Sequence, residues 1–320
     1  MPYRIRRSET VPEGVRRVAC EQIDRAVGEI DDVDLDPHET VHQVRKRCKK
    51  IRGLLRIVRP QLEETYQSEN AFFRDAAREL AGLRDAQSML ECYDRLMEHF
   101  DKQVDRRQFA SIRARLTRER DQLAHQQGDI AASLDTFRGR MLTARERVAE
   151  WSIPDEEFDT LRDGFEKTFR RAQRALRLAY DDPTPEKFHE WRKRVKYHRY
   201  HCRLLRSIWP SMLNVYRDTA DELGDLLGDD HDLAIIRGRV LDAPDEYGDT
   251  KDVEAFVALV DGRRSRLQAE ARPLGLRMFA HDPEAISAWF ATCWRAWRRE
   301  KKLKRKHARR TALARNAATG

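Results

Sequence analysis

The sequence lacks a disulfide framework, a membrane span and a secretion signal. Its five cysteines among 320 residues are dispersed, odd in number and without a CxxC pair, which favours reduced thiols in a cytoplasmic protein. No run of 18 apolar residues occurs, so no membrane association is predicted. The opening residues MPYRIRR contain no apolar segment, so they do not resemble a signal peptide.

Strand patterns and catalytic motifs are also missing. Alternating apolar residues bounded by Gly/Asn turns do not occur, and prolines separate segments of helical periodicity, so the fold class is predicted to be all-α. The expected helices span residues 12–30, 37–59, 66–100, 103–127, 129–150, 156–180, 185–209, 211–241 and 250–270, with a last helix after 283. Because no glycine-rich phosphate loop, GxSxG elbow or Cys/His nucleophile pair is visible, we predict neither catalysis nor a cofactor.

Acidic residues are absent from one long stretch, residues 42–59, which carries eight Lys/Arg and no Asp/Glu. The beginning of this stretch, 42–52, recurs as 189–199 at a constant offset of 147 residues. The same register still aligns Asp85 with Asp232. A gap-free repeat of this length indicates two copies of one structural unit.

Each copy is predicted to be a helix with one apolar and one basic face, at about 100° per residue. We define the basic faces as the first and second cationic ladders. The first ladder contains His42, Arg45, Lys46, Lys49, Arg52 and Arg56. The second contains His189, Arg192, Lys193, Lys196, Arg199 and Arg203. Like charges at i,i+3 and i,i+4 destabilise a helix by about 0.2–0.5 kcal/mol per pair, so an anionic ligand is expected to relieve the repulsion.

Positive charge is concentrated in three segments of an otherwise acidic protein. Residues 42–59 carry +8, 189–206 carry +6 and 295–310 carry +9, whereas the net charge of the whole chain is +8. The remaining residues therefore carry −15, and this segregation favours attraction of polyanions. The third segment adds four candidate binding residues, Arg295, Arg298, Arg299 and Lys302.

The repeat and the proline breaks predict the domain organisation. The best boundary lies near Ile153 and Pro154, at the midpoint of the repeat. We therefore expect a first helical bundle over 1–153, a second over 154–310, and a disordered tail over 311–320. The last helix is expected to dock before about Lys302 and to fray beyond it.

Two patterns could indicate metal sites. Residues 38–42 spell HExxH, the helical zinc-protease pattern. His38 follows a proline at a helix start, the second copy has Pro185 in its place, and nearby cations would repel a zinc ion, so we reject proteolysis. The cluster 229–232 (DDHD) has metal-ligand chemistry, but the repeat shares only Asp85/Asp232, which favours a structural role pairing an Arg or His of the basic helix.

The two ladders, each followed by a Leu/Gly-containing turn with Asp, resemble the CHAD domain, the conserved histidine α-helical domain. The matching positions are His42, Arg45, Lys49, Lys50 and Arg52, and His189, Arg192, Lys196, Arg199 and Tyr200. The resemblance covers residues 10–310. It implies two antiparallel bundles related by a pseudo-twofold axis, with the basic helices facing a shared groove or pore.

The resemblance further implies non-catalytic binding of inorganic polyphosphate, often at polyphosphate granules. The triphosphate-tunnel domain with ExExK that often accompanies this family is not found in the sequence. The alternative is a nucleic-acid-binding protein, which the sequence pI near 9.3 permits. The ladders have few Asn, Gln or aromatic residues to read or stack bases, so this interpretation is secondary. His42 and His189 are either buried, hydrogen-bonded histidines or donors at the anion site.

Overall fold

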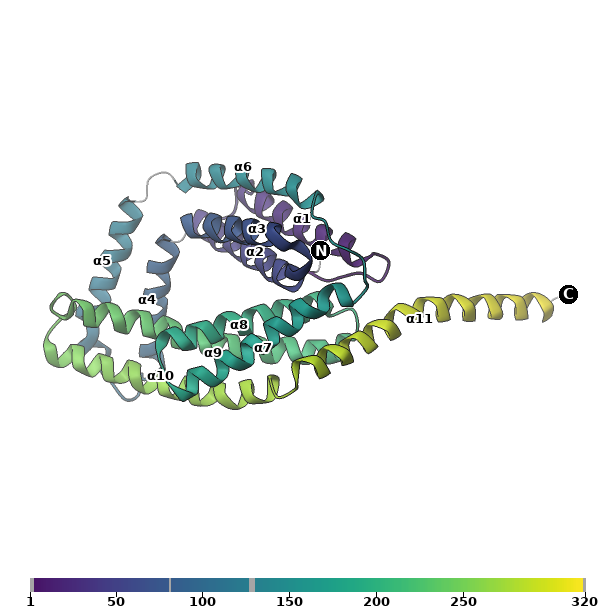
Figure 1. The fold of residues 1–320 in the computed structure, drawn as a ribbon. Helices are drawn as coiled ribbons and strands as arrows, with labels where there is room; N and C mark the ends of the chain where they lie inside the picture. The colour runs from purple at the N-terminus through teal and green to yellow at the C-terminus, as the bar shows by residue number, and fades with distance from the viewer. Residues whose placement is uncertain (1–2, 81, 127–129, 319–320) are drawn as a thin grey trace.

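The computed structural model describes residues 3–80, 82–126 and 130–318, and within these ranges every regular element is a helix (Figure 1), which confirms the all-α prediction. The side chains of 82–85, 124–126 and 301–318 are outside the description. The first half contains α1 Val11–Ile30, α2 Pro37–Ile57, α3 Arg59–Glu79, α4 Gly82–His99, α5 Ala110–Gln126 and α6 Ile130–Ala149. The second contains α7 Asp159–Asp181, α8 Pro185–Leu205, α9 Pro210–Asp242, α10 Thr250–Met278 and α11 Pro283–Ala318. Short 3-10 turns, Arg106–Phe109 and Pro244–Glu246, precede α5 and α10.

The two ladder helices begin with the same local device. Asp36 caps α2 by accepting hydrogen bonds from the backbone N–H groups of His38 and Glu39, and Thr184 caps α8 by accepting from the N–H of Lys187. A proline follows each cap, where its fixed φ suits the first helical turn and its missing N–H is not needed. The sequence therefore sets where both ladders start.

Helix contacts repeat between the halves. The pairs α1/α2, α2/α3, α1/α6 and α4/α5 are matched by α7/α8, α8/α9, α7/α11 and α9/α10. In this correspondence, α3 and α4 together are the equivalent, in the first half, of the single helix α9 in the second half. The duplication seen in the sequence is therefore also a duplication of helix packing.

The expected single helix over 66–100 is instead two helices. Helix α3 ends at Glu79, and α4 starts at Gly82 and packs against α9. The carbonyl oxygen of Leu80, at the end of α3, accepts from Nη1 of Arg45 on the first ladder at 3.5 Å. Glycine lowers helix propensity by about 1 kcal/mol relative to alanine, so Gly82 makes this break less costly.

The buried side chains form two clusters that do not follow the predicted boundary at 153/154. The larger cluster combines residues of α1, α2, α3 and α6 with residues of α7, α8, α11 and the ends of α9 and α10. The smaller combines α4 and α5 with the second half of α9 and the first part of α10. Both repeats thus contribute to both cores, because α2 packs on α8 and α7, and α4 packs on α9.

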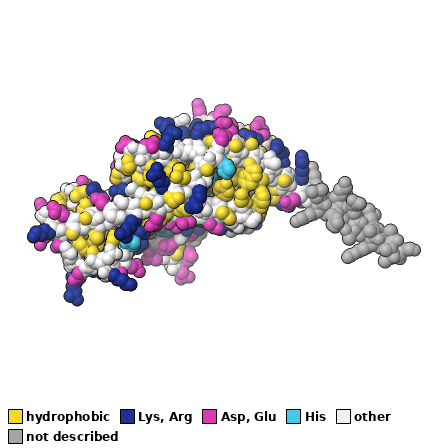
Figure 2. Space-filling model, turned by 90° about the horizontal axis from the view of Figure 1, so that it is seen from below, with side chains coloured by type: hydrophobic (Ala, Val, Ile, Leu, Met, Phe, Trp, Pro, Cys, Tyr) yellow, Lys and Arg dark blue, Asp and Glu magenta, His cyan; other side chains and the backbone are white. Residues whose placement is uncertain are grey.

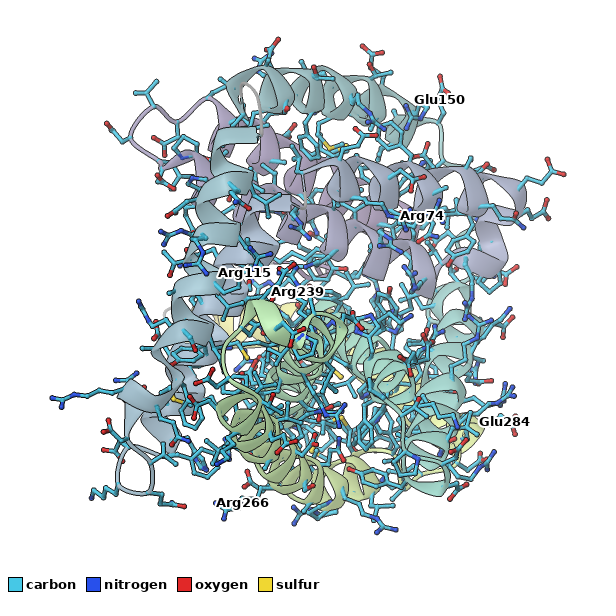
Figure 3. All side chains as sticks on the ribbon, turned by 90° about the vertical axis from the view of Figure 1, so that its left-hand side faces the viewer. Arg74, Arg115, Glu150, Arg239, Arg266 and Glu284 are labelled. Atoms are coloured by element: carbon cyan, nitrogen blue, oxygen red, sulfur yellow. The ribbon has the colours of Figure 1, made fainter. Side chains whose placement is uncertain are left out.

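Polar contacts also join the halves across the smaller core. Glu119 of α5 accepts hydrogen bonds from Arg239 of α9 at 3.3 Å and from the Tyr247 hydroxyl at 2.8 Å, and Arg115 pairs with it at 3.1 Å. Arg115 and Arg239 lie side by side where α5 meets α9 (Figure 3). Seen from below, basic, acidic and hydrophobic side chains are intermixed over the body (Figure 2).

Helix α11 leaves the body and projects from it (Figure 1). Its backbone is helical to Ala318, where the sequence predicts a disordered tail over 311–320, and 319–320 lie outside the described residues. The segment is rich in Ala, Leu, Arg and Lys, which have high helix propensity. Within the described residues no helix is long and apolar enough to cross a membrane.

Candidate functional site

The two ladder helices touch at positions that are equivalent in the repeat. Gly53 of α2 lies against Tyr200 of α8, and a Cβ built on Gly53 would be 2.7 Å from Cδ2 of Tyr200. Next to it, Nε2 of His201 lies 3.1 Å from the carbonyl oxygen of Gly53. The absence of a side chain at Gly53 thus allows α2 and α8 to approach closely, which brings the basic faces together.

The contacts around this crossing are reciprocal. The guanidinium of Arg56 on α2 lies over the ring of Tyr197 on α8, 3.8 Å from its centroid. The repeat-equivalent pair is Arg203 and Lys50, and the Arg203 cation lies close enough to lower the pKa of Lys50. Reciprocal pairs of this kind are what a local twofold axis produces. The axis itself stays a prediction.

Lys196 lies where the ladders meet. Burial and the cations of Arg192, Lys49 and Arg199 together lower its pKa to about 7, against an opposing effect of Asp232. Lys49 is the repeat equivalent of Lys196 and belongs to the other ladder. The field of the first ladder therefore acts directly on the second, so the two are one electrostatic site.

Lys50 is a basic residue that the two ladders did not include. Its side chain is only 6 % exposed, and its pKa falls to about 7 through burial and through the cations of Arg47, Arg203 and Lys46. The hydroxyl of Tyr3 donates to the Lys50 carbonyl oxygen at 3.0 Å, so the N-terminal segment packs over this turn of α2. The adjacent lysines Lys49 and Lys50 are visible in the sequence. The burial of Lys50 is not, because the N-terminal segment that contacts this turn of α2 is distant in the sequence.

Carboxylates of α8 and α9 partly neutralise the second ladder. Lys193 pairs with Glu190 one turn before it on α8, and Arg199 pairs with Asp221 of α9. Arg192 is half-buried against Gly228, and burial lowers its pKa while nearby aspartates oppose that shift; these are Asp232, Asp229 and Asp225. Carboxylates therefore stabilise the cations of the second ladder, mainly along the side that faces α9.

The first ladder has a different set of neighbours. Arg52 donates to Oδ1 of Asn70 on α3 at 3.2 Å, and Arg56 donates to the Arg52 carbonyl oxygen at 2.7 Å. Lys46 and Lys49 are exposed. Asp85, the repeat equivalent of Asp232, has a side chain outside the described residues, so its predicted pairing with the first ladder stays a prediction.

The histidines at the start of the two ladders, His42 and His189, are both half-buried. His189 packs against His231 of α9, with the two rings tilted by 32° and their Nδ1 atoms 3.1 Å apart. Burial and the cations of Lys193 and Arg192 lower the pKa of His189 to about 4, so both rings are neutral at pH 7 and one donates to the other. His189 is thus a hydrogen-bonded, half-buried histidine, as one of the two interpretations expected. His42 is half-buried in α2.

The third basic segment contacts the N-terminal segment rather than the crossing. Arg298 donates to the Arg7 carbonyl oxygen at 2.6 Å and to Glu157 at 3.2 Å, and its guanidinium lies over the Trp294 ring. Arg295 donates to Thr292 of its own helix. Arg299 lines a surface depression near Thr10, and the Lys302 side chain lies outside the described residues. Arg298 therefore anchors α11, and the predicted role of this segment in binding stays a prediction.

The acidic cluster 229–232 has structural partners. Asp230 is buried and accepts from Arg264 at 3.0 Å and from Gln268 at 2.8 Å, both on α10. Its neighbour His231 contacts His189, as described above, and Asp232 lies 3.6 Å from Arg95 of α4. Among the described residues no group of three or more His, Cys, Asp or Glu side chains is placed to hold a metal ion.

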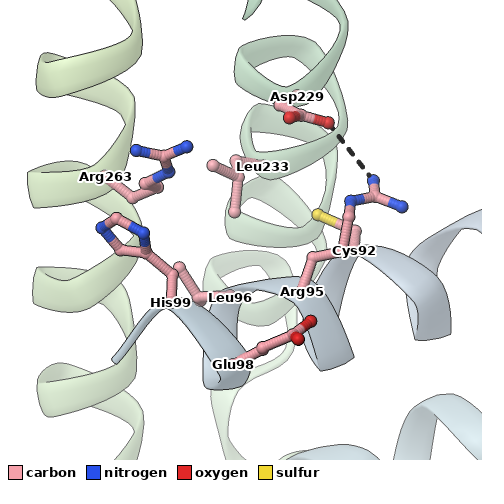
Figure 4. Close-up of a pocket in the computed structure, with 8 residues that line it drawn as sticks. All are labelled: Cys92, Arg95, Leu96, Glu98, His99, Asp229, Leu233 and Arg263. Carbon is pink, nitrogen blue, oxygen red and sulfur yellow. Dashed lines mark ion pairs between the residues drawn. The ribbon is translucent and has the colours of Figure 1, made fainter. Parts of the chain in front are cut away.

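A separate pocket of about 290 Å³ lies between α4, α9 and α10 (Figure 4). Arg95 and Asp229 form an ion pair at 3.5 Å on one side, and Arg263 lies near His99 on the other. Burial raises the pKa of the Cys92 thiol to about 12, so the thiol stays protonated. Charges of both signs line this pocket, which makes it less selective for anions than the ladder crossing.

Comparison with known proteins identifies the family of the chain and a solved structure of similar fold. A family model described as the CHAD domain matches residues 17–241. No curated protein matches the chain. Among solved structures, the crystal structure of the CHAD domain from the plant Ricinus communis aligns with a TM-score of 0.59 and 18% identity, covering 87% of this chain and 93% of that chain. Since the family model spans more than half of the sequence, the chain belongs to the CHAD domain family.

Proposed function

We propose that this protein binds inorganic polyphosphate, without catalysis, along the two ladders where α2 crosses α8. The observation that carries the proposal is the pair of lysines at the crossing, Lys50 and Lys196. Both are largely desolvated among other cations, and both have a pKa of about 7. Such an arrangement is costly in the free protein, and a bound polyanion offsets that cost.

The shape of the site favours a linear anion. From His42 to Arg56 the first ladder runs 14 residues, about 21 Å of helix. Arginine can donate two parallel hydrogen bonds to phosphate oxygens, whereas lysine acts as a point charge. A chain of phosphates can occupy successive cations of both ladders, and release of its counterions adds to the affinity.

Nucleic acid is the second candidate and fits less well. Base recognition needs amide side chains or free aromatic faces. Tyr197 and Tyr200 at the crossing are occupied by Arg56 and by the packing against Gly53. We therefore expect polyphosphate to displace the protein from single-stranded DNA at a far lower charge concentration than the reverse. We also propose that the protein acts in the cytoplasm and associates with polyphosphate granules.

The test is charge reversal at two exposed ladder residues, Lys46→Glu with Lys49→Glu. The matched control reverses two exposed arginines near and on α5, Arg107→Glu with Arg118→Glu, which changes the net charge equally. We expect the ladder variant to lose at least about tenfold of its affinity for polyphosphate, since two phosphate contacts become repulsive. Equal affinities in the ladder variant and the control would contradict the proposal, provided that circular dichroism shows unchanged helicity.

A further inference from the structure

Helix α7 has a basic face that the ladders do not include. Lys167, Arg170, Arg171, Arg174 and Arg177 are all exposed, and no Asp or Glu occurs between 167 and 180. At about 100° per residue they lie within an arc of roughly 120°, along about 15 Å of helix. We call these five residues the α7 stripe. Their i,i+3 and i,i+4 spacing places like charges next to one another, which destabilises the helix in the absence of an anion.

The equivalent face of the first repeat is not basic and is covered. The positions of α1 that correspond to the α7 stripe are Cys20, Ile23, Asp24, Val27 and Ile30. Helix α6 packs on α1 and pairs with it through Arg145 and Asp24. Because the second repeat has replaced these residues by five cations, the basic face is a property of α7 and not of the duplicated unit.

The packing of α11 explains why the α7 stripe is open. Helix α11 begins at Pro283 and contacts the first part of α7, for example through Phe165 and Phe290, whose ring centroids are 5.1 Å apart. It then leaves the body (Figure 1). In the described part of the chain, Arg170 is the one member of the stripe with a carboxylate partner, the exposed Glu284 at 2.8 Å, which lies at the surface (Figure 3). The stripe lines a depression of about 340 Å³.

A buried arginine links the α7 stripe to the first ladder. Arg59 starts α3, is 8 % exposed, and has two guanidinium nitrogens, Nε and Nη2, without a hydrogen-bond partner. Burial and the cation of Arg171 lower its pKa to about 10, and Arg56 of the first ladder lowers it too. Arg59 in turn lowers the pKa of Lys167. Cations therefore continue from Arg56 through Arg59 to Arg171 and Lys167.

We propose that the α7 stripe is a second phosphate-binding surface, which holds the same polyphosphate chain after it leaves the ladder crossing past Arg59. This inference rests on the proposed function, because it adds a second surface to the same ligand. A short chain occupies the crossing alone, whereas a long chain reaches both surfaces. The α7 stripe therefore makes the protein selective for long chains.

The experiment compares three full-length variants against three ligands, which are tripolyphosphate, long-chain polyphosphate and a single-stranded oligonucleotide. The variants are Arg171→Glu with Arg174→Glu on α7, Lys46→Glu with Lys49→Glu on α2, and Arg107→Glu with Arg118→Glu as the charge-matched control. We expect the α7 variant to bind tripolyphosphate within twofold of the control and to bind the long chain at least about tenfold more weakly. Its log–log salt slope for the long chain should fall by roughly one unit, because about 0.7 counterions are released per phosphate contact of a single strand.

Each other outcome decides the matter. If the α7 variant matches the control with the long chain while the α2 variant loses affinity, the second surface is wrong and the proposed function stands. If the α2 variant also matches the control, both are wrong. If the α7 variant loses tripolyphosphate as strongly as the long chain, the stripe is part of the primary site and the length selectivity is wrong. If the α7 variant loses affinity only for the single-stranded oligonucleotide, the stripe is a nucleic-acid surface and the inference is overturned.

Discussion

Helices α1 and α7 hold equivalent places in the two repeats but differ in what covers them. Helix α1 is flanked by α6, and exposed ion pairs such as Arg138 with Asp31 join them. Helix α7 is contacted by α11 over its first part, and it also lays Gly164 against the backbone of Ile57 in α2. Equivalent helices of a duplicated unit can thus differ in exposure: α1 is packed against a neighbouring helix, whereas α7 presents an open, charged surface.

A difference at one pair of equivalent positions accompanies this divergence. The residue equivalent to Gly164 in the first repeat is Arg17, which binds Glu9 and Glu21 instead of approaching another helix. On that side, α8 is contacted by the N-terminal segment, where the backbone N–H of Ile5 donates to the Leu204 carbonyl oxygen at 2.9 Å. The duplicated helices therefore keep their fold while their outer contacts change.

The largest expected effect comes from Gly164→Ala, which tests the close approach of α7 to α2. A Cβ at this position would lie 1.9 Å from the carbonyl oxygen of Ile57, so α7 must move away from α2. We expect a loss of about 3 kcal/mol in the free energy of unfolding, because backbone on both sides prevents local relaxation. Urea unfolding followed by circular dichroism measures the change.

Gly28→Ala in α1 is the matched control. No atom lies within 4 Å of a Cβ built on Gly28, so the substitution should leave the free energy of unfolding unchanged or raise it by up to about 1 kcal/mol. Equal effects at Gly164 and Gly28 would show that the close approach of α7 to α2 has no energetic weight.

A change of pH separates the buried cations of α8 from the exposed cations of α7. Lys196 has a folded-state pKa of about 7, below the ordinary value near 10.4, and a bound phosphate favours its protonated form. Polyphosphate affinity should therefore fall as pH rises from 7 to 9, by at most about tenfold per pH unit for each such lysine. Isothermal titration at several pH values measures this.

The sign for the unliganded protein is opposite. Between pH 7 and about 10 the unfolded chain binds more protons at Lys196 and Lys50 than the folded chain, so the free energy of unfolding rises with pH over this range. Lys196→Arg keeps its charge and should flatten the pH dependence of binding. The loss caused by Arg171→Glu with Arg174→Glu should be the same at pH 7 and pH 9, and a pH-dependent loss would contradict the distinction between the two surfaces.

The smallest expected effect concerns the ion pair between α6 and α1. Asp24→Asn removes the exposed ion pair with Arg145, whose Nε lies 2.6 Å from Oδ1 of Asp24. Exposed pairs contribute little, so the free energy of unfolding should fall by about 0.5 kcal/mol or less in a thermal melt. A loss above about 1 kcal/mol would mean that this pair, and not apolar packing, holds α6 on α1.

The sequence alone predicts the helical fold, the duplication and the starts of both ladders, because these depend on local periodicity, caps and prolines. Helix α2 ends at Ile57, two residues before the expected end, because Val58 leaves the helical conformation (φ −103°, ψ 7°) and a new helix starts at Arg59, with Pro60 in its first turn. The basic faces of α2 and α8 follow from spacing. That the ladders meet at Gly53 and Tyr200 depends on tertiary packing that spacing does not encode.

Two features of the site were beyond the reach of local patterns. Lys50 is buried at a turn of α2 where the hydroxyl of Tyr3, 47 residues away in the sequence, donates to its carbonyl oxygen. The cations of the α7 stripe are visible in the sequence, but whether a neighbouring helix covers them depends on the direction in which α11 leaves the body. Similarly, the two predicted bundles share their cores because α2 and α4 pack on helices of the other repeat.

The shared cores constrain how this protein can be divided or have evolved. A fragment holding the second repeat alone would expose Phe256 to water, because its ring packs against the rings of Tyr93 and Phe109 in the first repeat. Since both repeats contribute to both hydrophobic clusters, we expect either repeat expressed by itself to aggregate. The unit that folds is therefore the pair of repeats and not the single repeat.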